Sequence, residues 1–202
     1  MALAAFLLVA LIWWLLPRRV DFLAPKNGPI VVLGDSLAFG LGAESNHGYI
    51  GVLQKRLNLE IVNKGVSGDT SKMALDRLQK DVLDLKPALV IVELGGNDFM
   101  QKVPLEQTFA NLDQIITRVQ AQQTPVLLVG IKSGIFGNEA SSHYKRLASQ
   151  RHTGLVVNAM GDILTRADLK SDPIHPNDKG YEAMADNIEP ELRWMLHKLG
   201  RI

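Results

Sequence analysis

The chain has 202 residues, which suits one domain and would make two domains small. With 47% hydrophobic and 21% charged residues, its composition is that of a globular protein and excludes intrinsic disorder and collagen-like repeats. The 22 basic and 21 acidic side chains leave a net charge of +1, so we expect no nucleic-acid partner held by bulk charge. Cysteine is absent, which excludes disulfides, thiolate catalysis and cysteine-based metal sites.

The first 20 residues differ in composition from the rest of the chain. Residues 2–16 carry no charged or polar side chain, and arginines at positions 18 and 19 end this apolar run. A membrane-spanning helix needs about 20 apolar residues, so the run is short, although arginine stems can extend it. Trp13 and Trp14 lie where the aromatic belt of a membrane interface is expected. We therefore predict that residues 1–20 are an uncleaved membrane anchor.

Two other interpretations of this segment stay open. A cleaved signal peptide carries positive charge before its apolar stretch and small residues at its cleavage site, and neither feature is present. The segment could instead be a buried helix, although a terminal helix that is apolar all round is unusual in a soluble domain. For an anchored protein, the arginines after the apolar run favour a cytoplasmic position of the body.

After the anchor, residues 21–28 resemble a tether, and residues 29–202 form one domain of alternating strands and helices. Short β-branched runs predict buried strands, and apolar residues at near-helical intervals predict the helices between them. The expected strands are Ile30–Leu33, Leu59–Asn63, Ala88–Val92, Pro125–Gly130 and Leu155–Asn158. The expected helices are Gly48–Leu57, Thr70–Leu85, Leu105–Gln120, Glu139–Gln150 and Lys179–Leu199.

Five short apolar strands separated by helices predict an α/β fold, a three-layer α/β/α sandwich around a five-stranded parallel sheet. In such sheets, ligands bind outside the carboxyl ends of the strands. Polar and glycine-rich segments follow these strand ends here. We therefore expect the functional residues to gather at this edge of the sheet.

Three residues fit the nucleophile, base and orienting group of a serine hydrolase. Ser36 follows the first strand, where its hydroxyl can face a cleft, although a serine there is also a common helix cap. His175 is the candidate base because Asp172 lies three residues before it, close enough to fix the imidazole tautomer. Asp172 could equally be a turn residue before Pro173.

Two further residues are candidates for stabilising an oxyanion. Gly68 can expose a backbone N–H where a side chain would crowd an acyl group, although turn glycines are common. Asn97 can aim its amide at the same point, or it can simply cap the following helix. Each residue is a weak signal alone, and the case rests on their appearance after successive strands.

Other chemistries lack their motifs. The sequence has no G-x-S-x-G elbow, no phosphate-binding loop, no dinucleotide-binding glycine pattern and no histidine cluster at metal-ligand spacing. We therefore expect no cofactor and no metal.

The four segments that hold these residues resemble, in order and spacing, the four blocks of the SGNH, or GDSL, hydrolases. The segments are Gly34–Leu37, Ser67–Thr70, Gly95–Asp98 and Asp172–His175. The bacterial branch of thioesterase I, lysophospholipase L1 and arylesterase enzymes is the most similar. The resemblance implies a flavodoxin-like sheet with strand order 2-1-3-4-5. It also implies a triad of Ser36, His175 and Asp172, with the oxyanion hole formed by the N–H groups of Ser36 and Gly68 and the side chain of Asn97.

The resemblance implies a serine esterase that hydrolyses carboxylic esters or thioesters through an acyl-enzyme. Lysophospholipids, acyl-CoAs and aryl esters are the expected small-molecule substrates, and the periplasmic side of a membrane is the favoured location despite the arginines. The alternatives are a carbohydrate O-deacetylase with the same triad and a non-catalytic flavodoxin-like binding module. Oligomeric state stays unknown. The expected acyl pocket is lined by Phe99, Met100, Ile135 and Phe136, which could equally be residues of ordinary core or lid packing.

Overall fold

A computed structural model describes residues 27–44, 48–131 and 137–202. The expected anchor, most of the tether and the expected pocket residues Ile135 and Phe136 lie outside these ranges. Within these ranges, no helix has both the length and the apolar character needed to cross a bilayer.

Five strands form one sheet in which every neighbouring pair is parallel. The strands are β1 (Ile30–Gly34), β2 (Ile61–Gly65), β3 (Leu89–Glu93), β4 (Val126–Val129) and β5 (Gly154–Val156). Their order is β2-β1-β3-β4-β5, and β1 is paired on both sides, with Ile30 opposite Ile61 on one neighbour and Leu89 on the other. The predicted fold class and strand order are confirmed.

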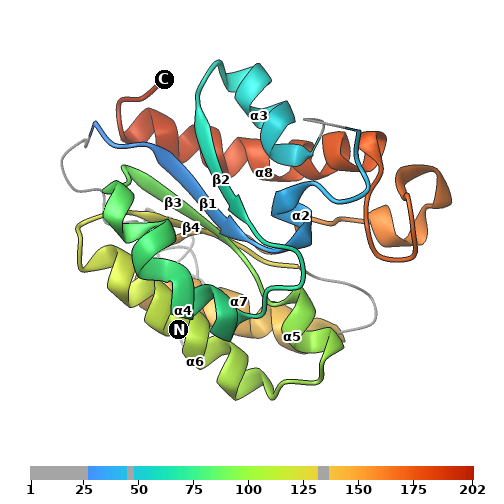
Figure 1. Cartoon of the computed structure of the whole chain (residues 1–202), viewed down its shortest axis with the longest axis horizontal. Helices are drawn as coiled ribbons and strands as arrows, with labels where there is room; N and C mark the ends of the chain where they lie inside the picture. Colours follow the sequence, from blue (N-terminus) through green and yellow to red (C-terminus); the bar gives the residue numbers. More distant parts are fainter. Residues whose placement is uncertain (1–26, 45–47, 132–136) are drawn as a thin grey trace, which may run out of the picture.

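Helices cover both faces of the sheet, so the molecule has three layers (Figure 1). One face carries α3 (Tyr49–Leu57) and α8 (Asp178–Lys198), and the other carries α4 (Ser71–Asp81), α6 (Leu105–Gln120) and α7 (Gly137–Arg151). Short helices α2 (Ser36–Phe39) and α5 (Gly96–Met100) follow β1 and β3 directly. Single 3₁₀ turns lie at Leu83–Leu85 (η1), Ile163–Thr165 (η2) and Ala167–Leu169 (η3).

The central strands are buried on both faces because their side chains alternate between two apolar clusters. Ile30 and Val32 pack with α3 and α8, whereas Val31 and Leu33 pack with α4, α6 and α7. All four side chains are at most 1% exposed. Burial of each such side chain contributes about 1.5–3 kcal/mol, so this strand is a main determinant of the fold and holds the loop that follows it firmly.

Several elements differ from those expected from the sequence. β2 begins two residues later than expected and extends through Asn63, Lys64 and Gly65, since an edge strand tolerates polar and small residues. The helix expected to end at Leu85 ends at Asp81, where a 3₁₀ turn follows. The one-turn helices α2 and α5 were not predicted because four or five residues carry no helical periodicity.

The described chain enters the sheet at the edge opposite the carboxyl ends of the strands. Residues 27–29 lead into β1, and the Arg201 guanidinium donates to the carbonyl of Gly28 at 3.2 Å, so the C-terminus lies at this same edge. The loops after the strands, which carry the candidate site residues, lie at the other edge (Figure 1).

Candidate active site

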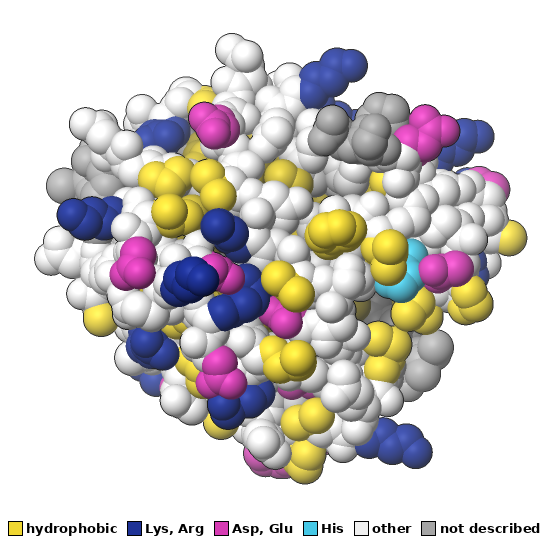
Figure 2. Space-filling model, viewed as in Figure 1, with side chains coloured by type: hydrophobic (Ala, Val, Ile, Leu, Met, Phe, Trp, Pro, Cys, Tyr) yellow, Lys and Arg dark blue, Asp and Glu magenta, His cyan; other side chains and the backbone are white. Residues whose placement is uncertain are grey.

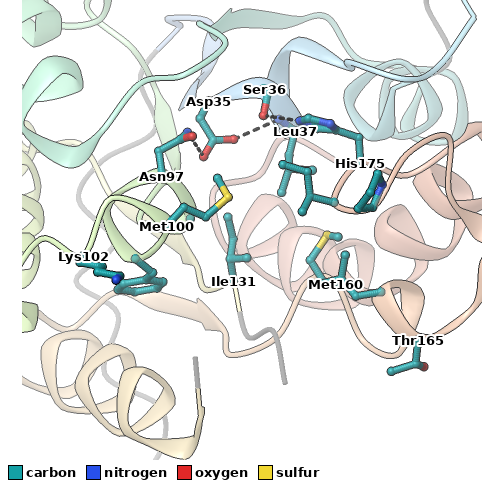
Figure 3. Close-up of a pocket in the computed structure, with 15 residues that line it drawn as sticks. Asp35, Ser36, Leu37, Asn97, Met100, Lys102, Ile131, Met160, Thr165 and His175 are labelled. Carbon is teal, nitrogen blue, oxygen red and sulfur yellow. Dashed lines mark hydrogen bonds between the residues drawn. The ribbon is translucent and has the colours of Figure 1, made fainter. Parts of the chain in front are cut away.

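Ser36, His175 and Asp172 form one hydrogen-bonded chain at the carboxyl edge of the sheet. His175 Nε2 lies 3.0 Å from Ser36 Oγ, and His175 Nδ1 lies 2.7 Å from Asp172 Oδ2 (Figure 3 shows the Ser36–His175 contact). With the ring proton on Nδ1, the imidazole donates to the carboxylate and accepts from the serine hydroxyl. This is the arrangement in which a histidine can take a proton from serine.

Asp172 is held by its own loop. Its Oδ1 accepts hydrogen bonds from the backbone N–H groups of Ile174, at 2.9 Å, and His175, at 2.8 Å. Partial desolvation opposes ionisation, but these bonds and the bond from the His175 ring outweigh it and lower the pKa of Asp172 to about 2. Asp172 is therefore a carboxylate at neutral pH, which is the form that can orient and stabilise an imidazolium.

The turn between β1 and α2 presents Ser36 to the cavity. Asp35 is the N-cap of α2, and its Oδ1 accepts from the Leu37 N–H at 3.0 Å, so Ser36 is the first helical residue rather than the cap. The backbone N–H of Ser36 thus belongs to the open first turn of the helix, where N–H groups have no partner within the helix.

Asp35 is an acidic side chain with little access to solvent. Only 2% of the residue is exposed, and burial is the main reason that its pKa rises to about 6, with Asp69 and Asp98 adding repulsion. Its Oδ2 accepts from the amide of Asn97 at 3.1 Å. This carboxyl group therefore links the turn that carries Ser36 to helix α5.

Gly68 occupies the third position of a tight turn after β2. The Asp69 N–H donates to the Val66 carbonyl at 3.1 Å, and Gly68 has φ +87°, the conformation that a type II turn requires at this position. A Cβ added to Gly68 would meet no heavy atom within 4 Å, so the glycine is required by its backbone angle and not by crowding.

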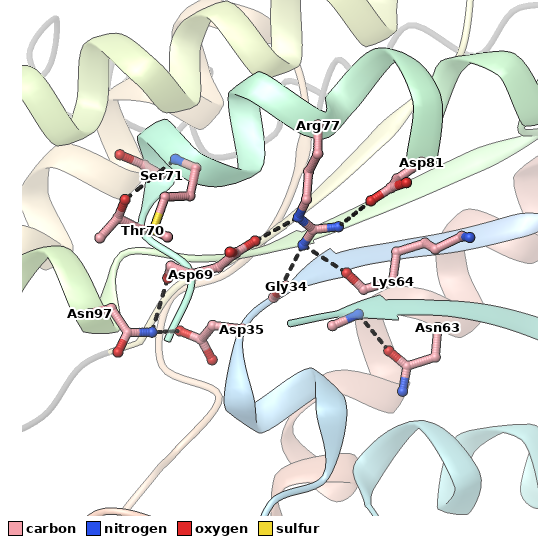
Figure 4. A network of polar contacts seen from close by, with 12 residues as sticks. Gly34, Asp35, Asn63, Lys64, Asp69, Thr70, Ser71, Arg77, Asp81 and Asn97 are labelled. Carbon is pink, nitrogen blue, oxygen red and sulfur yellow. Dashed lines mark hydrogen bonds and ion pairs between the residues drawn. The ribbon is translucent and has the colours of Figure 1, made fainter. Parts of the chain in front are cut away.

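Asn97 lies in α5, directly after β3, and lines the same cavity as Ser36. Its amide nitrogen donates to Asp35 Oδ2 and, at 2.9 Å, to the carbonyl of Asp69 (Figure 4). Both amide hydrogens thus point to protein acceptors. To donate to an oxyanion, the amide must share or release one of these two bonds.

A cavity of about 510 Å³ opens beside Ser36, Asn97 and His175 (Figure 3). The predicted pocket residues Phe99 and Met100 line it. Sequence reasoning missed the other apolar residues of the wall, which come from the segments that follow β1, β4 and β5: Leu37, Ile131, Met160, Leu164, Pro173 and Ile174.

Only part of this wall had a usable signal in the sequence. Leu37 and Ile131 directly follow residues already noted at strand ends, so the same strand-end test could have found them. Met160 and Leu164 lie in the long connection after β5, where isolated apolar residues carry no pattern. Across the described residues, no group of histidine and acidic side chains has the arrangement of a metal site.

Known proteins resemble this chain along most of its length. The GDSL-like lipase/acylhydrolase family matches residues 32–183. Esterase TesA of Pseudomonas aeruginosa is 34% identical over 180 residues, which cover 83% of this chain and 89% of that protein. Thioesterase 1/protease 1/lysophospholipase L1 of Escherichia coli K12 is 31% identical over 182 residues, which cover 86% and 88%. A crystal structure of TesA superimposes with a TM-score of 0.78 at 32% identity and covers 83% of this chain and 99% of that one.

Proposed function

The chain belongs to the GDSL-like lipase/acylhydrolase family and is a serine esterase, and from this premise we propose that Ser36 is its nucleophile. His175 is the general base and Asp172 orients and stabilises it. The contacts of 3.0 and 2.7 Å along this chain of three side chains are the support for these roles.

The reaction proceeds in two steps. Ser36 Oγ attacks the ester carbonyl while His175 Nε2 takes the hydroxyl proton, and the tetrahedral intermediate collapses when His175 returns that proton to the leaving alcohol or thiol. A water molecule, deprotonated by His175, then attacks the acyl-enzyme and releases the carboxylic acid. The oxyanion receives hydrogen bonds from the N–H groups of Ser36 and Gly68 and from the Asn97 amide, which exchanges one of its protein acceptors for the oxyanion.

The substrate class follows from the cavity beside Ser36. Its wall is predominantly apolar, and its volume of about 510 Å³ is far larger than an acetyl group needs. An extended acyl chain fits this space, as in a lysophospholipid, an acyl-CoA or a fatty aryl ester. A carbohydrate O-deacetylase would need a small acyl site beside a polar wall for the sugar, so it is the less favoured alternative.

The surface around the cavity supports a lipid-like substrate. The described part of the chain exposes eight large apolar side chains. Six of them lie at the carboxyl edge of the sheet, where the cavity opens: Phe39, Leu41, Val66, Met73, Met100 and Ile174. Figure 2 shows hydrophobic side chains gathered around the histidine visible on this face. Clustered exposed apolar groups are characteristic of sites that meet apolar partners.

A chain-length panel tests the substrate class. We expect kcat/KM to rise from acetyl to long-chain p-nitrophenyl esters and the enzyme to accept acyl-CoAs and lysophospholipids. Met100→Trp, which narrows the cavity, should reduce activity on long chains and spare the acetyl ester. Leu85→Trp, at an exposed apolar side chain in η1 outside both the cavity lining and this apolar surface, should change neither. Activity confined to acetyl esters in the unmodified enzyme would favour the deacetylase.

The location of the enzyme is a second proposal. Residues 1–20 hold it at the membrane without being cleaved. The family resemblance, and not the arginines, supports a catalytic domain that faces the periplasm. Fractionation followed by N-terminal sequencing tests the anchor, since a soluble form that begins near Pro25 would identify a signal peptide. Protease digestion of spheroplasts tests the side, since a protected domain would place it in the cytoplasm, as Arg18 and Arg19 suggest.

A further inference from the structure

Arg77 reaches from α4 to the ends of two strands. Its side chain is only 17% exposed, and its guanidinium makes four different contacts (Figure 4). Nε donates to Asp69 Oδ2 at 2.6 Å and Nη1 to Asp81 Oδ2 at 3.0 Å. Nη2 donates to two backbone carbonyls, those of Gly34 at 3.1 Å and Lys64 at 2.8 Å.

These contacts join the two loops that carry the backbone oxyanion donors. Gly34 is the last residue of β1 and lies two positions before Ser36. Lys64 is the penultimate residue of β2, and Asp69 directly follows Gly68 and closes its turn. Arg77 therefore fixes the distance between the loop that presents the Ser36 N–H and the turn that presents the Gly68 N–H.

The third donor is connected to the same group. The carbonyl of Asp69, whose carboxylate binds Arg77, accepts a hydrogen bond from the Asn97 amide. This single aspartate thus links Arg77 to Gly68 through the chain and to Asn97 through its backbone oxygen. Each of the three oxyanion donors follows a different strand, and each is close to a group that binds Arg77. Ser36 lies two residues after Gly34, Gly68 lies one residue before Asp69, and Asn97 donates to the Asp69 carbonyl.

The four acceptors around position 77 require the branched guanidinium of an arginine, and a shorter or unbranched cationic side chain cannot contact all of them. A planar guanidinium offers five N–H donors in fixed directions, whereas a lysine ammonium is a single point with three donors and cannot span four acceptors on three segments. Oxyanion stabilisation depends on donors that are already in place before the reaction, and displacements of about 1 Å cost large factors in rate.

We propose that Arg77 is a positioning residue that sets the mutual placement of the three oxyanion donors. It touches no substrate and acts through Gly34, Lys64 and Asp69. The proposal rests on the triad and oxyanion roles proposed above. It predicts that loss of Arg77 impairs the transition state more than the binding of substrate.

The test compares Arg77→Met with Arg151→Met. Arg151 binds Asp113 through two hydrogen bonds, at 2.5 and 2.6 Å, and joins α6 to α7 away from the site, so it is a control for the loss of a bidentate ion pair. For Arg77→Met we expect kcat to fall about 10- to 100-fold, below the roughly 10²–10³ for removal of an oxyanion donor, with KM within about 2-fold. Arg151→Met should keep kcat, and Arg77→Lys should recover little of it.

A second readout separates positioning from general stability. An alkyl trifluoromethyl ketone adds to the active-site serine and forms an oxyanion, whereas the fatty-acid product does not. Arg77→Met should weaken inhibition by the ketone about as much as it lowers kcat and should leave inhibition by the fatty acid unchanged. Equal losses for both inhibitors, an unchanged kcat in the folded variant, or an equal kcat loss in Arg151→Met would overturn the proposal. Normal turnover by Ser36→Ala would instead refute the proposed mechanism itself.

Discussion

The two sides of the active site are built in different ways. On the base side, Asp172 and His175 lie three residues apart in one loop, and the Asp172 side chain is 43% exposed. On the oxyanion side, Asp35, Asp69 and Asn97 come from the ends of three strands, and each residue is less than 10% exposed. A short surface loop therefore supplies the proposed base, whereas the proposed oxyanion donors depend on a buried network that joins the ends of three strands.

Because of this difference, we expect mutations on the base side to lower activity without lowering stability, and mutations on the oxyanion side to lower both. A change at Asp172 removes contacts within its own loop, so activity can be lost while the fold remains. A change at Asn97 leaves two buried acceptors, Asp35 Oδ2 and the Asp69 carbonyl, without their donor. An unpaired buried polar group costs about 1–3 kcal/mol, so variants on this side should lose activity and stability together.

Ser36, which stands between the two sides, should show the largest effect. We expect Ser36→Ala to lower kcat by about 10⁶, since a serine hydrolase without its nucleophile retains only a small residual rate. The hydroxyl makes one hydrogen bond, to His175, so the free energy of unfolding should change by about 1 kcal/mol or less. Ester hydrolysis and urea unfolding measure the two quantities, and substantial turnover by the folded variant would exclude Ser36.

On the base side, Asp172→Asn should lower kcat by roughly 10⁴ through the wrong imidazole tautomer. Stability should change little, because an asparagine carbonyl can still accept from the N–H groups of Ile174 and His175. Asp168→Asn is the matched control, since Asp168 pairs with Arg166 in a neighbouring exposed turn and should leave kcat intact. A normal rate in Asp172→Asn would remove this residue from the triad.

On the oxyanion side, Asn97→Ala should lower kcat by roughly 10²–10³ with a smaller change in KM, and it should also destabilise the fold. Asn111 is the matched control, because its amide is similarly buried and donates to Ser71 Oγ at 3.0 Å without lining the cavity. Asn111→Ala should lose comparable stability and keep kcat. If only KM rises in Asn97→Ala, the amide binds substrate and does not stabilise the oxyanion.

Asp35 allows a finer test of burial on the oxyanion side. Its pKa is about 6 in the folded chain and near 3.8 when unfolded, so between these pH values the folded protein holds a proton that the unfolded chain releases. The contribution of Asp35 to the free energy of unfolding therefore falls as pH rises from about 4 to 6, by up to about 3 kcal/mol, and then levels off.

Asp35→Asn removes this titration. Urea unfolding at pH 4, 5, 6 and 7 should show the stability of Asp35→Asn rising relative to the unmodified protein across that interval, whatever constant offset the lost hydrogen bond adds. A difference that stays the same at all four pH values would show that Asp35 is not desolvated as the structure places it.

The sequence was informative where local pattern and structure coincide. Apolar β-branched runs predict buried strands such as Ile30–Gly34. The helix Leu105–Gln120 begins and ends at the residues that the sequence predicted. Ser36, His175 and Asp172 could be proposed from residue type and position. The carboxyl ends of parallel strands share one edge of the sheet, and Asp172 and His175 lie three residues apart in the sequence.

Contacts between residues that are far apart in the sequence could not be predicted from local patterns. In the sequence, Arg77 is an ordinary polar residue of an amphipathic helix. Its contact with the carbonyl of Gly34, 43 positions away, is formed only in the folded chain. The same holds for Met160 and Leu164, which become cavity wall only when the connection after β5 returns to the loops around Ser36. The sign of a pKa shift such as that of Asp35 also depends on burial, which no local pattern reports.

Covalent labelling with a fluorophosphonate tests the central claim, that Ser36 is the nucleophile activated by His175. The account predicts one adduct per chain, located by peptide mass spectrometry on Ser36, absent from Ser36→Ala and formed far more slowly in His175→Ala. An adduct on another serine, or undiminished labelling of Ser36→Ala, would contradict it.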